Sequence, residues 1–134
     1  NCIIGRNVYI GPGVVIGNNC KIQNNALIYE PSVLGDGVFI GPGVVLTNDK
    51  FPSATNSHGV LKTSGDWAAS AVVVKSGASI GAGSVCVAPV TVGSEALIGA
   101  GSVVTRDVPD GAVVFGNPAR IQTTSKASSP NALS

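Results

Sequence analysis

The residues best suited to chemistry lie in one polar stretch, NDKFPSATNSHGVLKTSGDW, at residues 48–67. It opens with Asn48 and Asp49, whose amide could hold a polar group of a ligand and whose carboxylate could accept a proton. It also contains His58, the only histidine of the chain and a residue type suited to general-base catalysis. A structural role is the alternative for Asn48 and Asp49, because both residue types commonly bond to the nearby backbone in turns.

Metal and thiol chemistry find little support in the sequence. Catalytic zinc needs several protein ligands at specific spacing, so a single histidine predicts no metal site. Three cysteines do not indicate an oxidised scaffold. Cys2 and Cys20 lie eighteen residues apart, which could indicate a disulfide or a metal pair, but we expect both, like Cys86, to be small buried thiols.

The polar stretch interrupts a repeat in which an apolar residue returns at every sixth position. A small or turn-forming residue recurs three places later, and a second, mostly small apolar residue follows at the fourth place. A period of six fits neither a helix nor one long strand, and it is typical of the hexapeptides of a parallel β-helix. The two series are Ile4, Ile10, Ile16, Ile22, Ile28, Leu34, Ile40 and Leu46, then Val74, Ile80, Cys86, Val92, Ile98 and Val104.

Each hexapeptide predicts a short strand followed by a corner. The two apolar positions are two residues apart and point to the same side of a strand, and Gly or Asn accepts the positive φ of a corner. Stacked coils would then align inward columns such as Ile10, Ile28 and Leu46. We expect parallel strands from about residue 3 to 108, with residues 48–67 as one long inserted loop on a binding face.

Composition and chain ends set further limits. Charged residues make up 11% of the chain and nearly balance, so nucleic acid and anionic membranes are not expected partners. No apolar run or signal-peptide pattern indicates a membrane span or export, so we expect a cytoplasmic protein. We assign residues 1–121 to one domain, with N-terminal coils missing because the chain begins inside the repeat, and residues 122–134 to a flexible tail.

Two segments carry a family resemblance. One is LTNDKFP at residues 46–52, which leads to GDW at 65–67, and the other runs from GASIGAG at 77–83 through IGAGSVVTRDVP at 98–109 to GNPAR at 116–120. They resemble the left-handed β-helix, hexapeptide-repeat acyltransferases, in particular the N-acetyltransferases of nucleotide-linked amino sugars in surface-glycan synthesis such as that of lipopolysaccharide. The hexapeptides and GNPAR are shared by many acyltransferases, whereas the loop motif and Trp67 point to the 3-amino-sugar branch.

The resemblance implies an all-β, single-stranded left-handed parallel β-helix, a homotrimer with active sites between subunits, and acetyl-CoA as cosubstrate. Asn48 would hold the sugar, and Asp49 would orient the amine or accept its proton. Small corner residues would let the pantetheine arm of CoA approach the backbone. A second set of residues, near the C-terminal end, would contact the nucleotide end of CoA. Alternatively, the glycines only form corners and the arginines are only solvated. These cofactor residues are Gly81, Ala82, Gly99 and Ala100, then Thr105, Arg106, Pro118, Ala119 and Arg120.

Three other functions are open to this fold. With His58 as a base, the protein would be an O-acetyltransferase acting on a sugar or serine hydroxyl, since a hydroxyl needs a base more than a neutral amine does. At His58 the resembled branch commonly has an acidic residue, and at Ser53 it usually has Arg. A zinc lyase of this fold would need several histidines, and a purely structural solenoid would need neither the long loop nor GNPAR.

Overall fold

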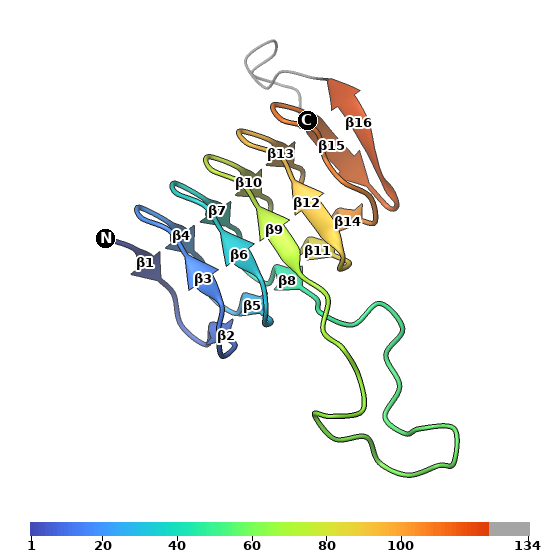
Figure 1. The fold of residues 1–134 in the computed structure, drawn as a ribbon. Helices are drawn as coiled ribbons and strands as arrows, with labels where there is room; N and C mark the ends of the chain where they lie inside the picture. The colour runs from blue at the N-terminus through green and yellow to red at the C-terminus, as the bar shows by residue number, and fades with distance from the viewer. Residues whose placement is uncertain (124–134) are drawn as a thin grey trace.

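The computed structural model, which describes residues 1–123, is a left-handed parallel β-helix with three faces (Figure 1). This confirms the all-β fold class and the period-six interpretation. Those residues include no helix, and hence none that could cross a membrane. The strands are β1 Ile3–Ile4, β2 Tyr9–Ile10, β3 Val15–Ile16, β4 Lys21–Ile22, β5 Leu27–Ile28, β6 Val33–Leu34, β7 Phe39–Ile40, β8 Val45–Leu46, β9 Val72–Val74, β10 Ser79–Ile80, β11 Val85–Cys86, β12 Val90–Val92, β13 Leu97–Ile98, β14 Val103–Val104, β15 Val113–Gly116 and β16 Ala119–Thr123.

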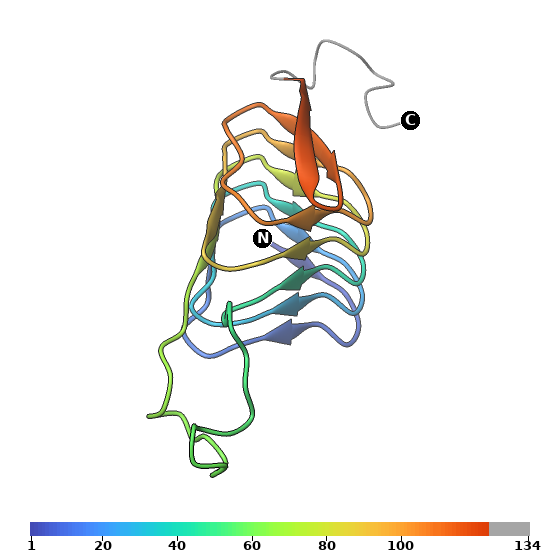
Figure 2. The same cartoon turned by 90° about the vertical axis from the view of Figure 1, so that its right-hand side faces the viewer.

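From β1 to β14 every third strand joins the same sheet, so one coil contributes one strand to each face. Face A has the order β1-β4-β7-β10-β13-β15-β16, face B the order β14-β11-β8-β5-β2, and face C the order β12-β9-β6-β3. Figure 2 looks along the stack, where successive coils superpose around a common interior. All pairs within these faces are parallel except β15 with β16.

The inward columns form the core. Ile10, Ile28 and Leu46 pair in register, as expected, and the column continues through Cys86 and Val104. Ile28, Leu46 and Cys86 are fully buried, whereas Ile10 in an outer coil is partly exposed. Each inward side chain packs on the same position of the next coil. The corners between strands therefore also align from coil to coil and form the edges of the prism.

The inserted loop, residues 47–71, leaves and re-enters the stack without breaking the register. Leu46 pairs with Cys86, where an uninterrupted repeat would bring residue 64. The Ser70 N–H donates to the Asn48 carbonyl at 2.8 Å and closes the root of the loop. The loop projects from the prism as a single excursion between β8 and β9 (Figure 1).

Two edges of face B matter for the site. Edge AB joins faces A and B and comprises residues 5–7, 23–25, 41–43, 81–83 and 99–101. Edge BC joins faces B and C and comprises residues 11–13, 29–31, 47–49, 87–89 and 105–107. The insert departs from edge BC.

The structure differs from the sequence-based expectation in two places. Cys20 and Cys86 are buried as expected, but Cys2 is exposed, because it lies in the first coil of this chain with no coil stacked beyond it. Strand β16 turns back antiparallel on β15 and extends to Thr123, two residues past the expected domain boundary at Ile121. The rest of the expected tail, residues 124–134, lies outside the described residues.

Candidate functional site

A polar cluster occupies edge BC where the insert begins. Asn48 stacks directly on Glu30 of the preceding coil, and its Nδ2 donates to the Glu30 carbonyl at 2.8 Å. The Asn48 side chain is only 9% exposed, and its Oδ1 accepts no hydrogen bond within residues 1–123. Asn48 therefore holds two coils together through one end of its amide and leaves the acceptor end available.

Glu30 is the functional candidate that the sequence analysis missed. Its carboxylate lies over Gly11 of the preceding coil, in space that a Cβ at Gly11 would fill. The Tyr9 hydroxyl lies 3.5 Å from Glu30 Oε2, and the Tyr9 and Tyr29 rings pack with centroids 5.0 Å apart. Partial burial and the nearby Glu30 carboxylate raise the pKa of the Tyr9 hydroxyl. The signal for Glu30 was available, since it precedes Asn48 by one eighteen-residue coil.

Asp49 lies one residue further along the edge. Its Oδ1 accepts the Phe51 N–H at 3.2 Å, as in an Asx turn, so the capping role considered from sequence is present. The carboxylate is half-buried and faces the insert, where it lines a concavity with Trp67. Asp49 can cap the turn through Oδ1 and still act on a ligand, because its second carboxylate oxygen accepts no hydrogen bond within the described residues.

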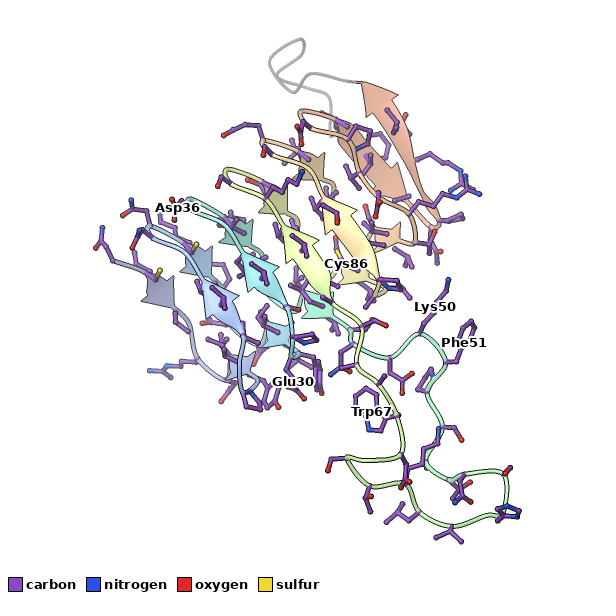
Figure 3. All side chains as sticks on the ribbon, viewed as in Figure 1. Glu30, Asp36, Lys50, Phe51, Trp67 and Cys86 are labelled. Carbon is purple, nitrogen blue, oxygen red and sulfur yellow. The ribbon has the colours of Figure 1, made fainter. Side chains whose placement is uncertain are left out.

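The insert is an ordered hairpin-like loop with a concavity of about 440 Å³ between its arms. Thr55 and Leu61 form an antiparallel bridge, and the Lys62 N–H donates to the Ala54 carbonyl at 2.9 Å. The concavity is lined by Asp49, Pro52, Ser53 and Ala54 from the outgoing arm and by Leu61, Lys62 and Trp67 from the returning arm. In Figure 3, Lys50 and Phe51 lie on the other side of the outgoing arm from Trp67.

His58 lies in the turn at the tip of this hairpin. Its N–H donates to Asn56 Oδ1 at 2.9 Å, and the same oxygen accepts the Val60 N–H at 3.1 Å. The His58 side chain is exposed. The turn is thus shaped by Asn56, and within one chain His58 is at the opposite end of the insert from Asn48 and Asp49.

The predicted small residues of the cofactor site lie on edge AB, across face B from Asn48. The N–H groups of Gly81 and Gly99 are not available to a ligand, because they donate to Ile98 and Val114 carbonyls at 2.8 Å. Ala82 and Ala100 are exposed residues, and their N–H groups have no acceptor within residues 1–123. Elsewhere on this edge, the Arg6 N–H is taken by the Asn24 side chain. Of the four small residues, Ala82 and Ala100 are therefore the two whose N–H groups could bond a ligand that approaches the backbone.

The predicted nucleotide-end residues gather around a second cavity, of about 290 Å³, at the C-terminal end of the prism. Arg106, Ala119 and Arg120 line it, whereas Thr105 and Pro118 do not. Its other lining residues are Val104, Asp107, Val108, Val114 and Ile121. Two arginines beside an apolar floor could pair with phosphate groups and accept a planar base. The β15–β16 hairpin creates this cavity by bringing Arg120 back toward edge BC.

Metal ligands do not gather in the described part of the chain. Within residues 1–123, no three His, Cys, Asp or Glu side chains lie close enough together to form a metal site. Burial raises the pKa of the Cys86 thiol to about 12, and burial also raises the pKa of Cys20. These two thiols are protonated core residues at neutral pH.

Two family models match the repeat on either side of the insert. The model described as bacterial transferase hexapeptide (six repeats) matches residues 13–48, and the hexapeptide repeat of succinyl-transferase matches residues 72–106. With three stacked faces and these repeats, the chain belongs to the hexapeptide-repeat acyltransferases. Its similarity to a curated relative lies in the amino-sugar branch of that family.

That relative is the dTDP-3-amino-3,6-dideoxy-alpha-D-galactopyranose 3-N-acetyltransferase of Aneurinibacillus thermoaerophilus. The two are 48% identical over 50 residues, which is 37% of this chain and 26% of the relative. The chain thus spans about a quarter of the length of the curated relative.

Solved structures of acetyltransferases share the fold. A hexapeptide-repeat acetyltransferase of Vibrio cholerae, complexed with acetyl coenzyme A, matches with a TM-score of 0.71 and 26% identity over 92% of this chain and 70% of its own. A maltose O-acetyltransferase of Clostridium difficile matches with a TM-score of 0.77 over 94% of this chain and 67% of its own, at 24% identity. The second likeness concerns the fold alone.

Proposed function

We propose that this chain transfers an acetyl group from acetyl-CoA to the amine of a nucleotide-linked 3-amino-deoxyhexose. The observation that carries the proposal is the cluster of Glu30, Asn48 and Asp49 on one edge at the root of the insert. The relative with 48% identity over 50 residues is named for such a reaction and supports the substrate class. In keeping with the resemblance, we assign the reaction to the cytoplasm and to surface-glycan synthesis.

The reaction needs alignment and charge stabilisation more than a strong base. The neutral amine attacks the thioester carbonyl, a C–N bond forms, and the C–S bond breaks with release of CoA. The amine loses one proton, which Asp49 or Glu30 can accept, and CoA leaves as a thiol after taking up one proton. Asn48 Oδ1 is free to accept a hydrogen bond from the sugar and so to fix the direction of attack.

Acetyl-CoA fits residues at the two edges of face B. The free N–H groups of Ala82 and Ala100 suit the amide-rich pantetheine arm, because that arm offers carbonyl acceptors. Arg106 and Arg120 suit the phosphates at the nucleotide end. On edge BC, Arg106 is two coils from Asn48, roughly 10 Å at the spacing of stacked strands, so a chain-like cosubstrate lying along the prism can reach both.

We further propose that the prisms assemble as homotrimers through face B. Its outward column comprises Tyr9, Leu27, Val45, Val85 and Val103, of which all but Tyr9 are aliphatic. Burial of such a column removes apolar surface from water. Neighbouring prisms would bring edge AB of one chain toward edge BC of another, which unites the two halves of the site that one chain keeps apart.

The direct test uses two acceptors that differ in one atom. Purified protein is incubated with acetyl-CoA and either a dTDP-linked 3-amino-3,6-dideoxyhexose or the corresponding 3-hydroxy sugar, and products are identified by mass spectrometry. The proposal predicts an amide product from the amine and little or no ester from the alcohol. Efficient ester formation, with the amine left unmodified, would show an O-acetyltransferase instead.

A further inference from the structure

We propose that the concavity of the insert binds the nucleoside diphosphate part of the acceptor. This inference rests on the proposed function and adds which residues recognise the nucleotide. It concerns Trp67 and Lys62, which the mechanism of transfer does not use. The two line the same concavity as Asp49, so a ligand seated there also reaches the reacting edge.

The concavity is built by the insert itself. The Ser70–Asn48 bond of 2.8 Å closes its root, and the ladder of Ala54, Thr55, Leu61 and Lys62 closes its far end. Asp66 stabilises the returning arm, since its Oδ2 accepts both the N–H and the hydroxyl of Thr63 at 2.7 and 3.1 Å. The volume of about 440 Å³ falls within the usual range of small-molecule sites.

Its lining matches the chemistry of a nucleotide. The Trp67 side chain is 37% exposed and offers an aromatic surface on which a base can stack. Lys62 lines the concavity, and its nearest recorded charge is Asp66, whose pKa it helps to lower, so its ammonium can also face a diphosphate seated there. By contrast, the Lys50 ammonium lies over the Phe51 ring, 5.7 Å from its centroid, and does not line the concavity.

The charges also orient the ligand. Asp49 repels a phosphate and attracts an amine, whereas Lys62 does the reverse. A nucleotide sugar carries its diphosphate between the base and the hexose, so the sugar amine would lie toward Asp49 with the diphosphate toward Lys62. This is the orientation that the transfer reaction requires.

The test uses the intrinsic fluorescence of Trp67, which is the only tryptophan of the chain. Thymidine 5′-diphosphate is titrated into the full chain without acetyl-CoA, and thymidine and inorganic pyrophosphate are titrated in parallel. We expect a saturable change in Trp67 emission on titration with thymidine 5′-diphosphate. Lys62→Ala should weaken its binding roughly tenfold, as loss of one charge-assisted contact would, while the matched control Lys50→Ala changes it less than about twofold.

A second variant addresses stacking. Trp67→Ala, followed by isothermal titration calorimetry, should weaken diphosphate binding on the order of tenfold or more, because base stacking on an aromatic ring is lost. Equal effects of Lys62→Ala and Lys50→Ala, or unchanged affinity in Trp67→Ala, would overturn the inference. So would acetyl transfer to the nucleotide sugar with no thymidine diphosphate binding at the insert. Diphosphate binding that depends on Lys62 and Trp67, without any acetyl transfer, would support this site and contradict the proposed function.

Discussion

At the scale of single residues, Glu30 uses different atoms for its structural role and its proposed chemical role. Its backbone carbonyl holds Asn48, whereas its carboxylate makes one long contact with the Tyr9 hydroxyl. Replacing Glu30 by Gln keeps the backbone contact and the side-chain shape but removes the charge. We expect turnover with the amino sugar to fall by a factor on the order of 10 to 10², within the usual contribution of a positioned acid or base.

Thermal unfolding provides the control for Glu30→Gln, since its midpoint should change little. A variant that keeps full turnover would show that the carboxylate takes no part in the reaction. Full loss of folded protein would instead show that the charge is structural.

Asp66 makes the returning arm of the insert sensitive to acid. The N–H and then the hydroxyl of Thr63 bond to its carboxylate and lower its pKa below the ordinary 3.8. A lowered pKa in the folded state means that the charged form stabilises the turn above the ordinary pKa and that this stabilisation is lost as the pH falls below it. Trp67 emission between pH 6 and pH 2 should therefore change at or below about pH 4, and Asp66→Asn should remove that transition. The same transition in the variant would contradict this account.

At the scale of elements, the sequence predicts the strands well because each hexapeptide is a local unit that repeats. The six-residue period predicts strands β1 to β14 and the inward column through Leu46, because the stacking of coils depends only on the spacing of apolar residues. The hairpin inside the insert depends on Asn56, whose side chain bonds two amides across a turn, and nothing in the period indicates that. The β15–β16 hairpin was missed because GNPAR was interpreted as a motif for CoA rather than as a turn between strands.

The candidate site was predictable in part, for a related reason. Asn48 and Asp49 were predicted as site residues because they stand where the repeat stops. Arg106 and Arg120 were predicted from the family resemblance. To recognise Glu30 as a site residue, and to place Ala82 and Ala100 on the opposite edge, one must know which corner of the coil each residue occupies. The corner is fixed by three hexapeptides per coil, a number that the period of six does not by itself give.

Two buried serines test the packing of the coil interior. Ser32 Oγ is buried and has no hydrogen-bond partner among residues 1–123, whereas Ser84 Oγ donates to the Gly99 carbonyl at 3.0 Å and accepts the Ser102 N–H at 3.2 Å. Ser32→Ala should stabilise the fold by about 1 kcal/mol, because an unsatisfied buried hydroxyl carries a desolvation penalty. Ser84→Ala should destabilise it by about 1 kcal/mol or more, because its removal leaves the Ser102 N–H unpaired.

Urea unfolding followed by circular dichroism measures both changes. The two variants remove the same atom from two fully buried serines that differ in hydrogen bonding, so each controls the other. A loss of stability in Ser32→Ala similar to that in Ser84→Ala would contradict the assigned hydrogen bonding.

At the scale of the whole molecule, face B is expected to join the subunits. Val85 lies in its outward column between Val45 and Val103. Val85→Asp would place a charge in the interface, so sedimentation equilibrium at micromolar concentration should give trimers for the parent chain and monomers for the variant. Because the proposed site draws on two chains, the variant should also lose acetyl transfer. A monomeric parent chain that retains activity would contradict the shared site.

We expect the insert root, and not His58, to carry the transfer of an acetyl group to an amine. The deciding measurement is CoA thiol release with the dTDP-linked 3-amino sugar at several pH values, for the parent chain, Asn48→Ala and His58→Ala. We predict that Asn48→Ala lowers turnover by a factor on the order of 10² or more at every pH, since it misaligns the reacting groups, whereas His58→Ala changes it less than about threefold. Abolished turnover in His58→Ala with full turnover in Asn48→Ala would contradict the account and indicate base-catalysed O-acetyl transfer.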